Sequence, residues 1–68
     1  MVYIVAERVL GGSACMVLWT LDRSYAVRIA DLRTDGCVTG MVYQCADSGA
    51  IEEVHEGRKV VRPRNERL

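Results

Sequence analysis

The chain has 68 residues, of which half are apolar and 26% are charged, and its nine basic side chains balance nine acidic ones. This composition is too hydrophobic for a disordered chain. A chain this short buries only about 60% of the surface that its unfolded form exposes, which leaves room for one small core. We therefore expect a single globular domain of marginal stability, of the kind that is often a homodimer.

Targeting and membrane segments are not predicted. The apolar run at residues 1–6 has no basic residue ahead of it and is too short for a signal peptide. The longest apolar run, residues 14–19, is far below the roughly 18 residues that a membrane helix needs. The three cysteines are an odd number at irregular spacing, unlike the paired cysteines of a secreted scaffold. These features predict a cytoplasmic protein that does not contact a membrane.

The chain begins with a predicted strand, a glycine turn and a second strand. Residues 2–9 are rich in β-branched side chains, and Gly11 and Gly12 then permit a tight turn. Residues 14–21 are apolar on both faces of a strand, so both faces need a cover, from this chain or from a second subunit. This two-sided run is the basis for expecting a homodimer.

Residues 25–34 support two interpretations. Apolar side chains alternate with smaller or charged ones as in a strand, whereas Tyr25, Ile29 and Leu32 also follow helical spacing. Ser24 is available as an N-cap and Gly36 as a C-terminal cap for a helix. We prefer the strand, because the Asp-Gly pair at residues 35–36 stands between two β-rich runs, as in a hairpin. A short helix in an α+β fold is the alternative.

Two further strands complete the predicted fold. Residues 37–45 form one of them, and Gly40 inside it suggests a bulge or tight bend of the kind that curls a small sheet. After a turn at residues 47–49, the strand at residues 51–56 places Ile51, Glu53 and His55 on one face and the intervening residues on the other. Gly57 permits a last reversal into residues 58–62, and Pro63 ends the pairing because proline has no amide donor.

We therefore predict an all-β fold, a five- or six-stranded antiparallel meander that is curled or barrel-like. It forms one domain over residues 1–62, and residues 63–68 form a flexible basic tail. This architecture hosts many unrelated functions and identifies none of them.

The sequence contains no catalytic, metal or cofactor signature. Cys15, Cys37 and Cys45 lack the close pairing of a zinc site and lie in strand-like runs, where a cysteine usually packs as a small apolar residue. His55 has acidic neighbours but no nearby nucleophile, and we expect it to be a solvated surface histidine. We therefore expect a protein that is not an enzyme and holds no metal or cofactor.

Charge is distributed unevenly along the chain. Residues 1–57 contain four arginines and eight carboxylates, and no lysine or arginine lies between Arg33 and Arg58. An acidic face can speed the encounter with a basic surface and orient it. The simpler interpretation is a solvated hairpin, or one that the chain's own basic residues neutralise. We hypothesise a non-catalytic protein-binding module, an accessory or inhibitory protein that covers a partner surface through Asp47, Glu52, Glu53 and Glu56.

The alternative function is a small barrel that binds RNA or DNA. Residues 58–68 contain five basic residues and one acidic one, and the candidate phosphate contacts are Arg58, Lys59, Arg62, Arg64 and Arg67. Such barrels add stacked aromatic side chains to these charges. The four aromatic residues of this chain lie in strand-like settings that predict burial of most of them, and nucleic-acid binding is therefore the second interpretation.

Overall fold

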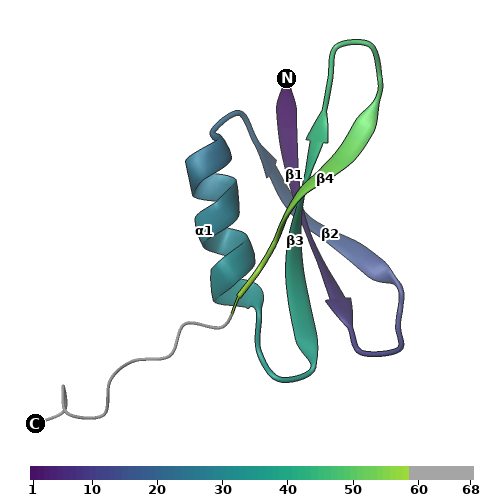
Figure 1. Ribbon diagram of the computed structural model, residues 1–68, viewed down its shortest axis with the longest axis vertical. Helices are drawn as coiled ribbons and strands as arrows, with labels where there is room; N and C mark the ends of the chain where they lie inside the picture. Colours follow the sequence, from purple (N-terminus) through teal and green to yellow (C-terminus); the bar gives the residue numbers. More distant parts are fainter. Residues whose placement is uncertain (59–68) are drawn as a thin grey trace, which may run out of the picture.

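The structure is a computed structural model that describes residues 1–58. It contains four strands and one helix, in the order β1 (Val2–Val9), β2 (Ala14–Thr20), α1 (Arg23–Arg33), β3 (Val38–Cys45) and β4 (Ile51–Glu56). The strands form one antiparallel sheet in the order β2-β1-β3-β4, and α1 lies across one face of it (Figure 1). Among residues 1–58, no helix is long and apolar enough to cross a membrane.

The mostly-sheet character of the domain is confirmed, but three details of the predicted fold are wrong for the described residues. The sheet has four strands, it stays open with β2 and β4 at its edges, and it is not a simple meander. The chain leaves β2 through α1 and returns on the far side of β1, so β3 pairs with β1 and not with β2. The predicted fifth pairing at residues 58–62 and the tail at residues 63–68 lie outside the described residues, apart from Arg58, which follows β4 without strand structure.

The preferred strand at residues 25–34 is wrong, and the helical alternative is correct. The N-cap is Asp22 and not Ser24, because the Asp22 carboxylate accepts a hydrogen bond of 3.2 Å from the amide of Tyr25. At the other end, the cap is Thr34 and not Gly36. An Asp or Thr at these positions satisfies orphan backbone groups that a frayed helix would leave to water.

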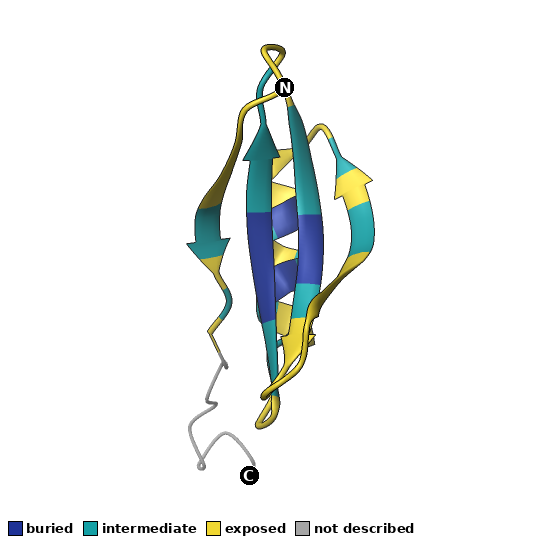
Figure 2. Ribbon diagram, turned by 90° about the vertical axis from the view of Figure 1, so that its right-hand side faces the viewer, coloured by how far each residue is buried: buried dark blue, intermediate teal, exposed yellow. Residues whose placement is uncertain are grey.

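The core lies between α1 and the two central strands. Val5 of β1, Val42 of β3, and Ala26 and Ala30 of α1 are fully buried, as the dark blue segments in Figure 2 show. Half-buried apolar side chains from β1, β2, α1 and β4 surround them, namely Tyr3, Val17, Leu18, Val27, Ile29 and Val54. Because alanine is small, two alanines one helical turn apart let the helix backbone come close to the sheet.

Gly40 makes this close approach possible. A Cβ atom at Gly40 would collide with the carbonyl oxygen of Ala30 and would lie 2.8 Å from its carbonyl carbon. The Thr34 hydroxyl joins the two layers, since it donates to the Ala30 carbonyl at 2.9 Å and accepts from the Gly40 amide at 2.9 Å. The predicted bulge at Gly40 is wrong, because Gly40 pairs with Glu7 in an unbroken β1–β3 register, and the glycine serves helix packing instead.

Bulges occur at two other places in the sheet. The β1–β2 pairing shifts between Val5 and Ala6, which leaves Val17 as an extra residue in β2. The β3–β4 pairing shifts between Val42 and Tyr43, which leaves Val54 as an extra residue in β4. Each bulge changes which side chains of its strand share a face.

Two of the predicted turns connect neighbouring strands, whereas the hairpin predicted at residues 35–36 is wrong. Gly11 joins β1 to β2 at φ 79°, and Gly49 joins β3 to β4 at φ 94°. These backbone conformations favour glycine because it has no Cβ atom. The Asp-Gly pair at residues 35–36 instead connects α1 to β3 in a tight turn, closed by paired hydrogen bonds of 2.8 Å between Asp35 and Val38.

Candidate protein-binding surface

The sheet face opposite α1, which we call the open face, is built from cross-strand rows of side chains. Residues that pair directly across antiparallel strands point to the same side of the sheet. Val5 points into the core under α1, so its neighbours Ile4 and Ala6 point to the open face. One row contains Trp19, Ile4, Tyr43 and Glu53, and the next contains Met16, Ala6, Met41 and Glu56. Each row crosses all four strands.

Both rows change in character from one edge of the sheet to the other. At the β2 edge, Trp19 and Met16 are 61% and 64% exposed. Over the central strands, Met41 is fully buried although it lies on the open face, and the Tyr43 hydroxyl donates to its Sδ atom at 3.6 Å. The rows therefore run from exposed apolar side chains at β2, over a filled centre, to carboxylates at β4.

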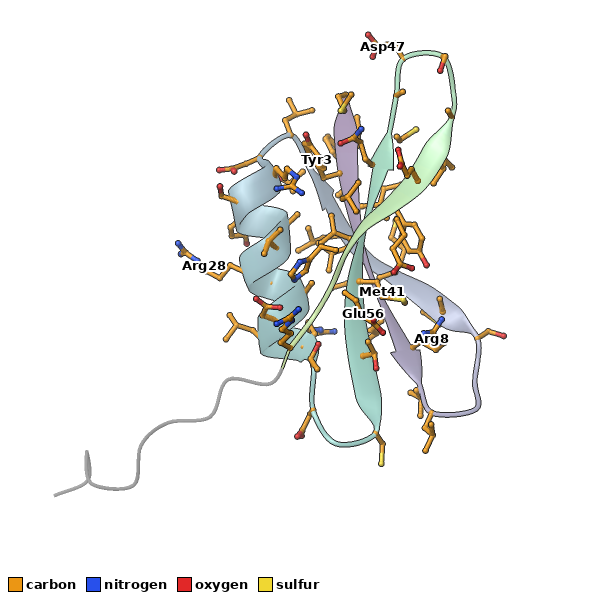
Figure 3. All side chains as sticks on the ribbon, in the orientation of Figure 1. Tyr3, Arg8, Arg28, Met41, Asp47 and Glu56 are labelled. Atoms are coloured by element: carbon orange, nitrogen blue, oxygen red, sulfur yellow. The ribbon has the colours of Figure 1, made fainter. Side chains whose placement is uncertain are left out.

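Glu53 and Glu56, which we call the acidic margin, end the two rows at the β4 edge. Both are exposed, and they pair with Tyr43 and Met41 respectively. Figure 3 shows Met41 and Glu56 on the side of the sheet away from α1, whereas Arg28 points outward from the helix. The strict alternation predicted for residues 51–56 is wrong, because the extra residue Val54 lets Glu53 and Glu56 share a face.

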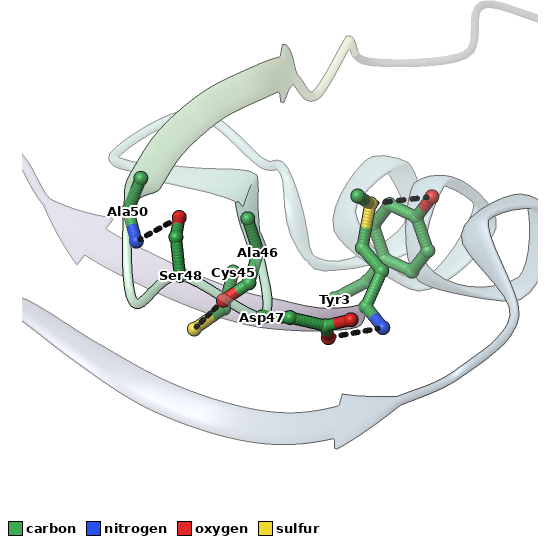
Figure 4. A network of polar contacts seen from close by, with 7 residues as sticks. Tyr3, Cys45, Ala46, Asp47, Ser48 and Ala50 are labelled. Carbon is green, nitrogen blue, oxygen red and sulfur yellow. Dashed lines mark hydrogen bonds and ion pairs between the residues drawn. The ribbon is translucent and has the colours of Figure 1, made fainter.

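The other two predicted acidic contact residues are exposed but lie elsewhere. Glu52 pairs with Gln44 and points to the opposite side from Glu53. Asp47 lies in the β3–β4 turn with its side chain 98% exposed, and its carboxylate accepts a hydrogen bond of 3.4 Å from the N-terminal amine of Met1 (Figure 4). The structure thus brings together two of the four predicted residues.

The predicted nucleic-acid contacts are mostly outside the described residues. Lys59, Arg62, Arg64 and Arg67 belong to that part of the chain. Arg58 is described, and its backbone amide donates to the Asp31 carboxylate at 2.9 Å, beside the C-terminal half of α1. The predicted burial of most of the aromatic residues is wrong, because Trp19 and Tyr25 are 61% and 44% exposed and Tyr3 and Tyr43 are only half-buried.

Asp31 connects α1 to the end of β4. One of its carboxylate oxygens, Oδ1, lies 2.9 Å from His55 Nε2 and also accepts the bond from Arg58. Burial raises the pKa of Asp31, but the hydrogen bonds and charges of His55 and Arg58 together outweigh it and hold the pKa below its ordinary value. His55 is partly buried against the helix, so the prediction of a solvated surface histidine is wrong.

The cysteines also differ from the prediction of buried core residues. Cys15 and Cys37 are exposed and Cys45 is half-buried, and all three are free thiols. Cys37 lies in the turn before β3 and not within the strand. Within residues 1–58, no three His, Cys, Asp or Glu side chains gather closely enough to hold a metal ion.

Sequence reasoning also missed part of the candidate site. It did not select Trp19 and Met16, although their run of residues was recognised as apolar on both faces. The signal that could have identified them is that residues 14–21 are apolar on both faces of a strand, whereas one short helix can cover only one face. Comparison with known proteins gives no assignment, since no family model matches the chain and no curated protein or solved structure matches it significantly.

Proposed function

We propose that this domain is a non-catalytic protein-binding module, an accessory or inhibitory protein that covers a partner surface. Its contact surface is the open face together with the acidic margin. The observation that supports this proposal is the order of side chains within the rows, from exposed Trp19 and Met16 at one edge to Glu53 and Glu56 at the other.

This order suits a protein partner with an apolar contact and a basic surface beside it. Tryptophan and methionine are enriched in protein interfaces, where a large side chain leaves water on binding. Carboxylates at the rim of such a contact set the orientation of a basic partner and speed its arrival. Trp19 and Met16 at the β2 edge would contribute most of the affinity, and the acidic margin would determine which partner binds.

RNA or DNA is the alternative partner, and it fits the open face less well. Trp19 and Tyr43 belong to one row and would be the stacking residues, but Glu53 ends that same row. A carboxylate beside a stacking platform repels the phosphate backbone that supplies most nucleic-acid affinity. The basic residue on this face within the described part is Arg8, which pairs with Ala14 and Thr39.

The test compares two double charge reversals that change the net charge equally. The full-length chain with Glu53→Lys and Glu56→Lys alters the acidic margin, and the control with Asp47→Lys and Glu52→Lys alters exposed carboxylates off the open face. A partner captured by the wild-type chain from the native host is purified, and its affinity for each protein is measured. We expect at least a tenfold loss for the margin variant, equivalent to about 1.4 kcal/mol, and less than a threefold loss for the control.

Two results would overturn the proposal. Equal affinities of the margin variant and the wild-type chain would exclude the acidic margin as a contact. Capture of nucleic acid by the wild-type chain, with binding that weakens steeply as salt rises and strengthens in the margin variant, would favour the alternative function. Thermal unfolding of each variant shows whether a loss of affinity comes from a loss of folding.

We also propose that the module is a cytoplasmic homodimer. In β2, Val17 and Leu18 are half-buried under α1, while Met16 and Trp19 on the other side are exposed. A second copy placed beside β2 would remove part of this exposed apolar surface from water. The three free thiols are consistent with a reducing compartment.

A further inference from the structure

The two edges of the sheet are not equally protected against pairing with another strand. An edge strand presents unpaired backbone amides and carbonyls, and proteins commonly block such an edge with charged side chains. The β4 edge carries three of them, Glu52, Glu53 and Glu56. The β2 edge, Ala14–Thr20, contains neither a charged residue nor a proline. Since each edge strand contains one bulge, the bulges do not account for this difference.

Exposed apolar side chains also gather along β2 and its two ends. Met16 and Trp19 lie within the strand, Leu10 precedes it at 83% exposure, and Leu21 follows it at 70% exposure. Along β4, the large apolar side chain with comparable exposure is Ile51, at 63%. The β2 edge therefore combines free backbone hydrogen-bonding groups with apolar side chains that gain by leaving water.

We infer that β2 pairs with β2 of a second copy, antiparallel about a twofold axis, so that the two sheets become one continuous sheet. Pairing a strand with itself in this way closes after two copies. A second copy is the partner that fits, because β2 carries no charge that would oppose pairing with itself. Pairing β4 with β4 would set carboxylates against carboxylates, whereas pairing β2 with β4 would leave one β2 edge and one β4 edge that can pair with further copies, which builds an open chain of molecules.

This arrangement keeps both open faces on the same side of the joined sheet. Met16 and Trp19 of the two copies then lie close to the twofold axis, and the acidic margins lie at the two outer edges. The inference rests on the proposed homodimer and specifies its interface. It leaves both acidic margins free for the proposed contact with a basic partner.

The size of the contact predicts a weak dimer. A seven-residue strand is about 24 Å long at roughly 3.4 Å per residue. One strand pair with its flanking side chains lies at or below the lower end of the roughly 1,200–2,000 Å² that stable interfaces bury. We therefore expect a dissociation constant in the micromolar range.

The test measures self-association of the full-length chain by sedimentation velocity between about 1 and 100 µM. Met16→Lys places a charge on the β2 edge, and Ile51→Lys is the matched control on the β4 edge, because the two side chains are 64% and 63% exposed. We expect Met16→Lys to raise the dissociation constant at least tenfold and Ile51→Lys to leave it within threefold. A wild-type chain that is monomeric at 100 µM, or a dimer weakened by Ile51→Lys and not by Met16→Lys, would overturn the inference.

A second measurement does not depend on any variant being folded. Hydrogen exchange of the wild-type amides is compared at the two ends of the same concentration range. Amides of β2 should become more protected as the dimer forms, and amides of β4 should not. Unchanged protection in β2 alongside measurable dimerisation would place the interface elsewhere and overturn the inference.

The outcome is separable from that of the proposed partner contact, because the self-association assay contains no partner. The margin variant with Glu53→Lys and Glu56→Lys should dimerise as the wild-type chain does while losing the partner. A β2 dimer without any effect of the margin variant on capture would refute the partner contact alone. Normal sensitivity of capture to the margin variant in a monomeric protein would refute the β2 interface alone.

Discussion

Replacing Gly40 with alanine tests the contact that holds α1 against the sheet. The new Cβ atom would collide with the Ala30 carbonyl oxygen and would lie 2.8 Å and 2.9 Å from the Ala30 carbonyl carbon and Cα. These are backbone atoms, so no side-chain rotation relieves the overlap, and the helix must move by more than about 1 Å to restore ordinary contact with the Ala30 carbonyl oxygen. Overpacking of this kind costs about 1–3 kcal/mol.

The same shift disturbs the hydrogen bond from the Gly40 amide to the Thr34 hydroxyl, which adds about 0.5–1.5 kcal/mol. We therefore expect Gly40→Ala to lower the free energy of unfolding by about 2–4 kcal/mol. A domain of 68 residues has roughly 3–10 kcal/mol in total, at about 0.05–0.15 kcal/mol per residue. The variant should be severely destabilised or unfolded.

Urea denaturation followed by far-UV circular dichroism measures this loss, with Gly36→Ala as the matched control. A Cβ atom at Gly36 would meet nothing within 4 Å, and the residue does not have a positive φ. This control should change the free energy of unfolding by less than about 1 kcal/mol. If Gly40→Ala stayed within 0.5 kcal/mol of the wild-type chain (about the accuracy of such measurements), the close packing of α1 on β3 would be refuted.

Two further predictions concern the polar contacts around α1. Thr34→Val keeps the side-chain shape but removes the hydroxyl between Ala30 and Gly40, and it should cost about 1–3 kcal/mol in urea denaturation, with Thr34→Ser recovering most of the loss. A valine variant as stable as the wild-type chain would show that these two bonds do not contribute. The pKa of Asp31 is lower in the folded chain than its ordinary value of 3.8, so the stability that this group contributes is present above that pH and is lost as the pH falls through the folded-state pKa. Below pH 4, the free energy of unfolding should therefore decrease more steeply with falling pH for the wild-type chain than for Asp31→Asn. An equal pH dependence of the two proteins would contradict this assignment.

The strands were predictable from the sequence because their composition and turns agree. Runs of β-branched residues bounded by glycine turns indicate β1, β2, β3 and β4 within a residue or two of their observed bounds. The helix is harder to predict, because Tyr25, Val27 and Ile29 alternate as strand residues do. Its usable signals were Asp22 as an N-cap and the small residues Ala26 and Ala30 at helical spacing. Once that stretch is a helix, β3 no longer has to pair with β2.

The candidate surface was predictable only in part, because it depends on sheet order and on a bulge. The acidic stretch was visible in the sequence, and the exposure of Glu53 and Glu56 follows from it. Their common face depends on the extra residue Val54, which strict alternation does not reveal. Their place in rows with Trp19 and Met16 depends on β1 and β3 lying between β2 and β4. Such long-range pairing is set by the packing of α1 and not by any local pattern.

The central position of β1 has a consequence for how the chain acquires its structure. The β1–β2 hairpin can form from neighbouring residues, but the other side of β1 stays unpaired until β3 has been synthesised and α1 has closed the connection. During that interval an apolar strand offers one free edge to any nascent chain nearby. A truncated chain that ends before residue 38 should therefore be prone to aggregate.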